Sequence, residues 1–396
     1  MHASLLITNV RLPDGTPVDI AVNDGRIEEI GPNLQRGADV VRENGQGALV
    51  LPGFVEGHTH LDKTNWGLPW YRNEVGPRLI DRIENERSWR ASTGHDAGAQ
   101  SLALARAFLA AGTTRLRTHV DIDTDVGLRH LHGVLATRET LAEVMEIQVV
   151  AFPQSGMLRR AGTDTLLSDA LMAGADVLGA LDPALIDQDP VASLDTTFEI
   201  ANRHQKPIDI HLHEPGEIGA FTFNLLLDRV KALGMQGRVV VSHAFCLGML
   251  ADRERDALLA RIADLGVALL TTAPPSVPVP SMRACIDAGV TLFAGNDGIR
   301  DTWTPFGKPD MLERAMFVGM RYDLRRDEDL ALAFDCVSTL GALACGFKDY
   351  GLHDGAWADL VLVDAETVAQ AVVSRPVRKL VVARGRIVAR DGVVSI

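Results

Sequence analysis

A unit that repeats through the middle of the chain constrains the fold most. In this unit an apolar helical pattern ends at a glycine, and a short β-rich run follows at once. Examples are DAGAQSLALARAFLAAG before TTRLRTHVDI and ERDALLARIADLG before VALLTT. Glycine suits the left-handed residue that closes a helix. The strands are continuously apolar, which is typical of a parallel sheet covered on both faces.

Eight such strands can be recognised along the middle of the chain. In order they are LVLPGFVEGH, TTRLRTHVDI, MEIQVVAFP, ADVLGALD, KPIDIHLHE, RVVVSHAF, VALLTT and VTLFAGND. Eight β/α units over about 300 residues favour a closed barrel over an open, doubly wound sheet. The sequence therefore predicts an α/β fold, a (β/α)8 barrel of the TIM type.

The two ends of the chain differ from this middle and look alike. Both alternate apolar and polar residues, as in LLITNVRL near the start and KLVVARGRIVARDG near the end. The steps Asn23-Asp24-Gly25 and Arg384-Gly385 are hairpin turn signals. Short strands at either end cannot bury a face alone. We therefore expect a small β-sandwich domain from residues 1–52 and 353–396, interrupted by a catalytic barrel of residues 53–352.

Composition excludes several kinds of partner. With 39 basic and 52 acidic residues the net charge is −13, and the absence of a long basic run argues against nucleic acid or an anionic membrane surface. No run of about 18 apolar residues is present, and the start lacks the pattern of a signal peptide. The four cysteines are scattered, which favours free thiols in a reducing compartment. We expect a cytoplasmic protein with a small-molecule partner, and leave homo-oligomer formation open.

Histidines gather at the predicted carboxyl ends of the strands, where barrel enzymes carry their chemistry. Six of the twelve histidines lie there: His58, His60, His119, His211, His213 and His243. A single histidine at a strand end could be structural, but six at one rim indicate a site. The histidines outside the rim, His95 and His130 among them, are expected at the surface.

The spacing of His58 and His60 points to a metal. Residues i and i+2 of a strand project on one face, so both imidazoles can reach one ion. Histidines from the fifth and sixth strands and Asp297 from the eighth can complete a mixed nitrogen and oxygen set. Such a set suits Zn²⁺, with Fe²⁺ or Mn²⁺ as alternatives.

Several longer motifs carry a family resemblance. They are GFVEGHTHLDK (53–63), RTHVD (117–121), VVAFPQSG (149–156) and NDGIRDTWTPFG (296–307). With the split β-domain, these motifs resemble the amidohydrolase superfamily, in the cytosine deaminase-like branch that also includes triazine aminohydrolases. Binuclear members carry a bridging lysine at the end of the fourth strand, and ADVLGALD has none. The resemblance therefore implies one divalent ion, with Zn²⁺ favoured, held by His58, His60, His211 and Asp297.

The resemblance also implies a reaction, the hydrolysis of an exocyclic C–N bond on a small nitrogen heterocycle such as a pyrimidine or s-triazine. The metal would lower the pKa of its bound water towards 7, giving hydroxide at neutral pH. Asp297 would accept the water proton and His243 would orient the hydroxide. Glu214, three residues after a ligand, would point into the barrel mouth and protonate the ring and the departing amine.

Other residues near the strand ends are candidates for substrate contact. The amide of Gln154 can read an amide-like ring edge, and Trp303 can stack on a ring. Lys63 and Arg300 can bind an anionic or carbonyl-rich substrate. For His213, packing and substrate contact stay equally open.

Alternatives remain at this stage. Gly298 stands where cytosine deaminases carry a second aspartate, which argues against cytosine itself. Ammonia and an alkylamine are both possible leaving groups. A cyclic amide (lactam) hydrolase is a second reading, which the missing fourth-strand lysine disfavours. A non-catalytic binding protein on the same scaffold is a third, although every expected ligand is present.

Overall fold

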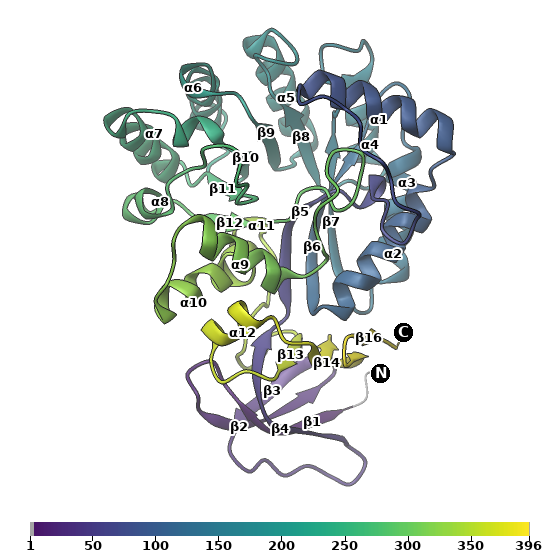
Figure 1. Ribbon diagram of the computed structural model, residues 1–396, viewed down its shortest axis with the longest axis vertical. Helices are drawn as coiled ribbons and strands as arrows, with labels where there is room; N and C mark the ends of the chain where they lie inside the picture. The colour runs from purple at the N-terminus through teal and green to yellow at the C-terminus, as the bar shows by residue number, and fades with distance from the viewer. Residues whose placement is uncertain (1–3, 396) are drawn as a thin grey trace.

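The computed structural model describes residues 4–395, and its larger part is a (β/α)8 barrel (Figure 1). The barrel strands are β5 (Phe54–Thr59), β6 (Thr113–Asp121), β7 (Glu146–Phe152), β8 (Val177–Leu181), β9 (Ile208–Leu212), β10 (Val239–His243), β11 (Ala268–Thr271) and β12 (Leu292–Ala294). They pair in parallel in this order. All eight predicted strands are present, and the predicted barrel is confirmed.

The barrel closes between its first and last strands at two of the predicted metal ligands. The backbone N–H of Asp297 donates to the carbonyl of His58 at 2.8 Å, and Thr59 Oγ1 donates to the Asp297 carbonyl at 3.0 Å. Thr59 and Asp297 form an isolated parallel bridge. Barrel closure therefore fixes the end of the first strand against the segment after the last strand, and with them the side chains of His58 and Asp297.

Helices surround the barrel strands (Figure 1). They are α1 (Leu79–Thr93), α2 (Ala97–Ala110), α3 (Arg129–Thr140), α4 (Thr163–Met172), α5 (Pro190–His204), α6 (Gly216–Ala232), α7 (Asp252–Asp264), α8 (Met282–Ala288), α9 (Met311–Arg321), α10 (Asp327–Asp335) and α11 (Thr339–Cys345), with short 3-10 turns at Leu61–Lys63 and Phe245–Gly248. The glycine at the end of a repeat unit has the predicted left-handed conformation, for example Gly112 (φ 95°) after α2 and Gly289 (φ 76°) after α8.

Strands from both ends of the chain form a second sheet at one end of the molecule (Figure 1). They are β1 (Leu5–Arg11), β2 (Pro17–Asn23), β3 (Arg26–Gly31), β4 (Val41–Pro52), β13 (Leu360–Val363), β14 (Arg378–Ala383), β15 (Arg386–Arg390) and β16 (Val393–Val394). They are hydrogen bonded in the order β16-β15-β14-β13-β4-β1-β2-β3, so the two halves meet where β4 pairs with β13. The expected joint β-domain is present as one continuous sheet.

Both predicted hairpin turns are present in this sheet. Asp24 and Gly25 have φ of 47° and 78°, and Arg384 and Gly385 have φ of 46° and 76°. Two consecutive positive φ values are the mark of the type I′ turn that suits a tight hairpin.

The position of the domain boundary stays a proposal. Strand β4 ends at Pro52 and β5 begins at Phe54, which suits a boundary after residue 52. Helix α12 (Val368–Ser374) belongs to the C-terminal part of the chain but packs against α9 and α10 of the barrel. Residues 1–3 and 396 of the proposed domain lie outside the described residues.

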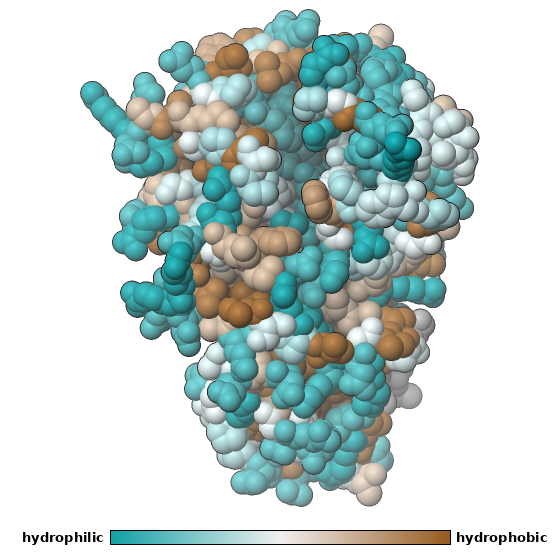
Figure 2. Space-filling view, viewed as in Figure 1, coloured by the Kyte–Doolittle hydropathy of each residue, from teal (hydrophilic) through white to brown (hydrophobic). Residues whose placement is uncertain are grey.

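Polar and apolar residues are distributed as in a protein with a buried core. One large apolar core unites the barrel strands with the helices, and a smaller one lies in the terminal sheet. The face seen in Figure 2 is mostly hydrophilic, with apolar residues in separate small patches. Among the described helices, none is both long and apolar enough to span a membrane. The four cysteines are buried free thiols.

Candidate metal centre and active site

The four predicted metal ligands come together at the carboxyl ends of three strands. One ligand atom from each of His58, His60, His211 and Asp297 lies within 4.8 Å of the other three. Asp297 Oδ1 lies 3.1 Å from His60 Nε2 and 3.8 Å from His58 Nε2. The three imidazoles are almost completely buried. Such a set of nitrogen and oxygen donors matches the preference of Zn²⁺ and similar divalent ions.

Unsatisfied nitrogen atoms support a metal at this place. Within residues 4–395, His58 Nε2 and both ring nitrogens of His211 are buried without a hydrogen-bond partner. Burying polar atoms in this way is costly unless they bind something. The residues present therefore fit a divalent ion.

A chain of hydrogen bonds orients His58. Ser242 Oγ donates its one proton to Asp209 Oδ1 at 2.8 Å. In its contact with His58 Nδ1, at 3.0 Å, the hydroxyl is therefore the acceptor and Nδ1 is the donor. Asp209 is in turn paired with Arg117 at 2.9 Å. A proton on Nδ1 leaves the Nε2 lone pair free to face the ligand cluster. Support of this kind is usual behind metal-binding histidines.

The protonation states suit metal binding. Burial and the neighbouring His119 hold the pKa of His58 well below its usual value, and burial and His58 do the same for His211. Burial alone would raise the pKa of Asp297, but its hydrogen bond with His60 and the nearby histidines hold it well below the usual range. Neutral imidazoles and a carboxylate are the forms that bind metals.

His243 and His213 flank this cluster. Their rings stack at 4.3 Å between centroids. His243 Nε2 lies 4.0 Å from Asp297 Oδ2, and burial and His213 lower the pKa of His243 to about 3. His213 Nδ1 lies 2.8 Å from Asp182 Oδ2. Burial opposes protonation of His213, but the charge of Asp182 and this hydrogen bond outweigh it and raise its pKa.

A cavity of about 480 Å³ adjoins the cluster. Its lining includes His60, His211, His213, His243 and Asp297, together with the predicted substrate residues Lys63, Gln154 and Trp303. The volume is that of a site for a small molecule. Seven of the residues predicted as ligands, catalytic groups or substrate contacts thus meet at the cavity, together with His213. His58 lies buried beside it.

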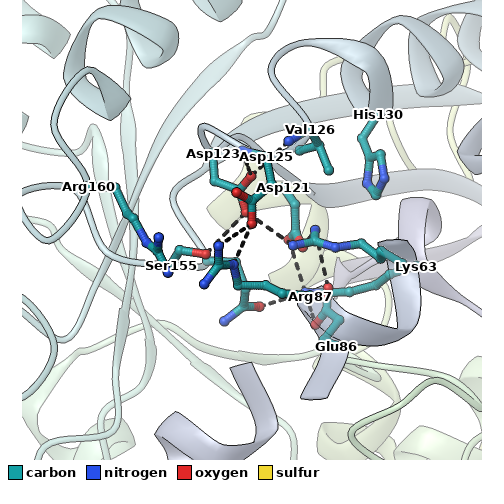
Figure 3. Close-up of polar contacts among 12 residues, drawn as sticks. Lys63, Glu86, Arg87, Asp121, Asp123, Asp125, Val126, His130, Ser155 and Arg160 are labelled. Atoms are coloured by element: carbon teal, nitrogen blue, oxygen red, sulfur yellow. Dashed lines mark hydrogen bonds and ion pairs between the residues drawn. The ribbon is translucent and has the colours of Figure 1, made fainter. Parts of the chain in front are cut away.

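A buried ionic network holds Lys63 at the wall of this cavity (Figure 3). Lys63 Nζ lies 3.0 Å from Asp121 Oδ1 and 3.5 Å from Glu86 Oε2. Arg90 pairs with Asp121 at 2.7 Å and with Asp123 at 3.1 Å. Burial opposes the charge on Lys63, but the surrounding carboxylates outweigh it and raise its pKa. Lys63 is therefore a fixed cation whose charge is already compensated.

The network also positions the two neutral substrate candidates. Gln154 Oε1 accepts from Lys63 Nζ at 2.6 Å, so the amide Nε2 is the end left free to donate. Trp303 Nε1 donates to Glu86, and Lys63 Nζ lies 5.6 Å from the centre of the Trp303 ring. Both side chains are thus held against the cavity.

Two residues predicted at the site, Glu214 and Arg300, do not line the cavity. Glu214 is fully buried and does not line the cavity: its carboxylate accepts from the backbone of Ala184 and Leu185 and from Thr222 Oγ1. His213 shares a face with His211, as residues two apart on an extended segment do, and Glu214 points to the other side. His213 takes the cavity position expected for Glu214.

Arg300, predicted to contact substrate, also lies away from the cavity. It is exposed, and its guanidinium lies 4.6 Å from the centre of the Trp66 ring, outside the cavity lining. His130, expected at the surface, is also buried, with Nδ1 2.8 Å from Asp62 Oδ2.

The structure adds cavity residues that the sequence did not indicate. Arg82 lines the cavity from α1, and no ion-pair partner is found for it within residues 4–395. Asp301 and Arg314 line it from the loop after β12 and from α9. Arg314 is engaged by Asn296 and by the carbonyl of Thr272, which leaves Arg82 as the cation with unused donors.

This fold and this set of strand-end ligands define the class of metal-dependent barrel hydrolases. The chain belongs to the amidohydrolase family, whose family model matches residues 44–395. As predicted, it is therefore an enzyme that hydrolyses C–N bonds.

Three relatives are similar along nearly the whole chain. The crystal structure of N-isopropylammelide isopropylaminohydrolase from Burkholderia multivorans is 62% identical, with a TM-score of 0.97, covering 99% of this chain and 100% of that one. N-isopropylammelide isopropyl amidohydrolase of Pseudomonas sp. (strain ADP) is 32% identical over 401 residues, 98% of each chain. The 5-methylcytosine deaminase of Klebsiella pneumoniae is 26% identical, with a TM-score of 0.87, covering 99% and 98%. These names agree with the predicted class, hydrolases of exocyclic C–N bonds on nitrogen heterocycles.

Proposed function

We propose that this enzyme hydrolyses the exocyclic C–N bond of an alkylamino-s-triazine and releases the alkylamine. The observation that carries the proposal is the metal-ligand cluster beside a cavity with an ionic and an apolar wall, in a chain 62% identical to an isopropylaminohydrolase. In balance, water adds its oxygen to the ring carbon, the C–N bond breaks, and the amine leaves with a proton.

We infer that the cofactor is a single divalent ion, with Zn²⁺ favoured and Fe²⁺ or Mn²⁺ as alternatives, held by His58, His60, His211 and Asp297. When bound, such an ion supplies Lewis acidity that lowers the pKa of water towards 7. Within the described residues, two other groups are close enough to hold an ion, but each contains a carboxylate that already has a cationic partner. Asp209 pairs with Arg117, and Asp121 pairs with Lys63. This supports one ion.

Asp297 and His243 handle the attacking water in this proposal. Asp297 Oδ2 faces His243 at the edge of the cavity, and its depressed pKa keeps it ionised. A carboxylate in this position can accept a proton from water. His243 is neutral because of its low pKa, so it orients the water by hydrogen bonding and does not repel the ion.

His213 delivers a proton to the departing amine. Because Asp182 occupies Nδ1, the free Nε2 is the nitrogen that can face substrate in the cavity. The charge of Asp182 raises the pKa of His213 and so favours the protonated form that a general acid needs. Protonation matters because an unprotonated amine would have to leave as a very basic anion. In this account His213 replaces Glu214 as the general acid.

The walls of the cavity suit a ring with an alkyl substituent. Phe245, Val277 and Phe306 add apolar surface to the lining, which can accept an isopropyl group. The amide of Gln154 and the guanidinium of Arg82 offer donors to ring oxygens. A dioxo-triazine with one alkylamino group presents both kinds of surface.

The substitution Arg82→Gln tests the contact to a ring oxygen. We expect KM for N-isopropylammelide to rise by about 10- to 100-fold with kcat within a few-fold of wild type, because a hydrogen bond to a charged group contributes about 1.5–3 kcal/mol. Steady-state kinetics measure both constants. Arg87→Gln, on the same helix but paired with Glu84 and Asp125, is the control and should leave KM unchanged. An unchanged KM in Arg82→Gln would remove Arg82 from the site.

A substrate panel tests the proposed function. The metal-loaded protein is incubated with N-isopropylammelide, with the triazine that carries NH₂ in place of the alkylamine, and with cytosine and 5-methylcytosine. We expect the highest kcat/KM for the alkylamino-triazine, measured as free amine. A higher value for either pyrimidine would assign the enzyme to deamination, and turnover of none of them would contradict the proposal.

A further inference from the structure

The loop after β12 brings a second carboxylate to the cavity beside the metal-ligand cluster. Asp301 is buried, with 3% of its surface exposed, and it lines the cavity with Asp297 and Trp303.

One oxygen of Asp301 is fixed by the loop itself. Oδ1 accepts from the backbone N–H of Trp303 at 2.8 Å and of Thr304 at 2.9 Å. The loop is tied on its other side, where Thr64 Oγ1 donates to the Ile299 carbonyl and the Asn65 N–H to the Arg300 carbonyl, both at 2.7 Å. The carboxylate is therefore held at a defined place.

The other oxygen of Asp301 is directed at the position of Gly298. A Cβ atom added at Gly298 would lie 2.0 Å from Asp301 Oδ2, far inside contact distance. Gly298 has no other constraint of this severity: the remaining close atoms also belong to Asp301. The glycine beside the metal ligand thus leaves the space that the Asp301 carboxylate fills.

Oδ2 has no hydrogen-bond partner in the part of the chain that the structure describes. Because Asp301 lines the cavity, this oxygen can accept a hydrogen bond from a bound molecule. The same lining holds Gln154 and Arg82, whose amide and guanidinium groups can donate, while Asp301 Oδ2 can accept.

We propose that Asp301 Oδ2 accepts a hydrogen bond from a ring N–H of the substrate, so that the cavity selects heterocycles with an imide edge, C(=O)–NH–C(=O). Such an edge presents two acceptors and one donor, and the lining offers two donor groups, on Arg82 and Gln154, and one acceptor, on Asp301. This inference rests on the proposed function, because it specifies the ring that the same site takes. It also explains why residue 298 is a glycine in this chain, since a side chain there would displace the Asp301 carboxylate.

The substitution Asp301→Asn tests this proposal with little disturbance of the loop. The amide oxygen of asparagine can still accept from Trp303 and Thr304, while an NH₂ group replaces the free acceptor. We expect KM for N-isopropylammelide to rise at least about 10-fold, with metal content unchanged. The preference of the enzyme for this substrate over its ring-N-methylated analogue should fall by a similar factor.

The substitution Gly298→Ala provides an independent route to the same result. The added methyl group must displace the Asp301 carboxylate, so KM and the loss of preference should follow Asp301→Asn. Asp310→Asn, in a helix cap outside this cavity, is the control and should keep wild-type KM. Unchanged KM and unchanged preference in Asp301→Asn would overturn the proposal. Turnover by the wild-type enzyme, measured in parallel, decides the proposed function separately.

Discussion

Replacement of His58 by alanine should remove the bound metal and lower kcat/KM at least about 10³-fold. The metal is expected to contribute several kcal/mol to the barrier, and each 1.36 kcal/mol corresponds to a factor of ten. The loss should be local, because His58 lies at the end of β5 and the barrel closure uses its backbone carbonyl, which alanine retains. Metal analysis of the purified variant and steady-state kinetics measure the two effects.

Ser242→Ala provides a graded version of this experiment. It removes the hydroxyl that holds His58 Nδ1, so metal affinity should fall about 10- to 100-fold while excess metal restores activity. His204→Ala, at the end of α5 and outside the cavity, serves as the control and should keep metal and rate. Full activity in His58→Ala without metal would contradict the assigned ligand set.

Replacement of His213 by glutamine should lower kcat about 10²- to 10⁴-fold, the usual contribution of general acid catalysis, with metal content unchanged. Glu214→Gln is the matched control from the adjacent position. Its side chain can still accept from Ala184 or Leu185, so we expect kcat near wild type. The opposite outcome, a large loss in Glu214→Gln and none in His213→Gln, would restore Glu214 as the proton donor.

The role of His213 as general acid also predicts the direction in which kcat changes with pH. Asp182 raises the pKa of His213, and a general acid works only while protonated, so activity should fall as the pH rises through that pKa. Asp182→Asn removes the stabilising charge and lowers the pKa. The alkaline limb of the profile should therefore move to lower pH in this variant, and an unmoved limb would show that another group titrates.

The architecture was predictable because it follows from local patterns. Helix-ending glycines and continuous apolar strands identified all eight barrel strands, and the turn residues at Asn23-Asp24-Gly25 and Arg384-Gly385 identified both terminal hairpins. The proposed metal ligands were predictable for a similar reason: His58 lies near the end of β5 and His60 directly after it, so both reach the same rim of the barrel. Their approach to His211 and Asp297 then follows from barrel closure.

The cavity walls were less predictable because they lie outside regular strands. Glu214 follows the last residue of β9 and is held away from the cavity by the backbone N–H groups of Ala184 and Leu185, while Asp182 holds His213 on the cavity side. The positive φ of Arg300 (47°) lies in a loop whose course no periodicity describes.

Helix α1 was not predicted from the sequence, for a different reason. Its inward side carries Glu86 and Arg90, which are satisfied by Lys63, Asp121 and Asp123 in a buried network rather than by apolar contacts (Figure 3). The sequence LIDRIENERSWRAST therefore lacks the apolar stripe by which a buried helix is usually recognised. Arg82, which this helix brings to the cavity, was missed with it.

The most direct test of the central claim is hydrolysis of N-isopropylammelide in H₂¹⁸O, followed by mass spectrometry of both products. We expect isopropylamine without label and an intact triazine ring with one ¹⁸O at the carbon that carried the amine, and neither product with the metal-free protein. A ring-opened product that keeps the isopropylamino group, with the label in a new N-carboxylate or in the CO₂ lost from it, would contradict this account and identify a cyclic amide hydrolase.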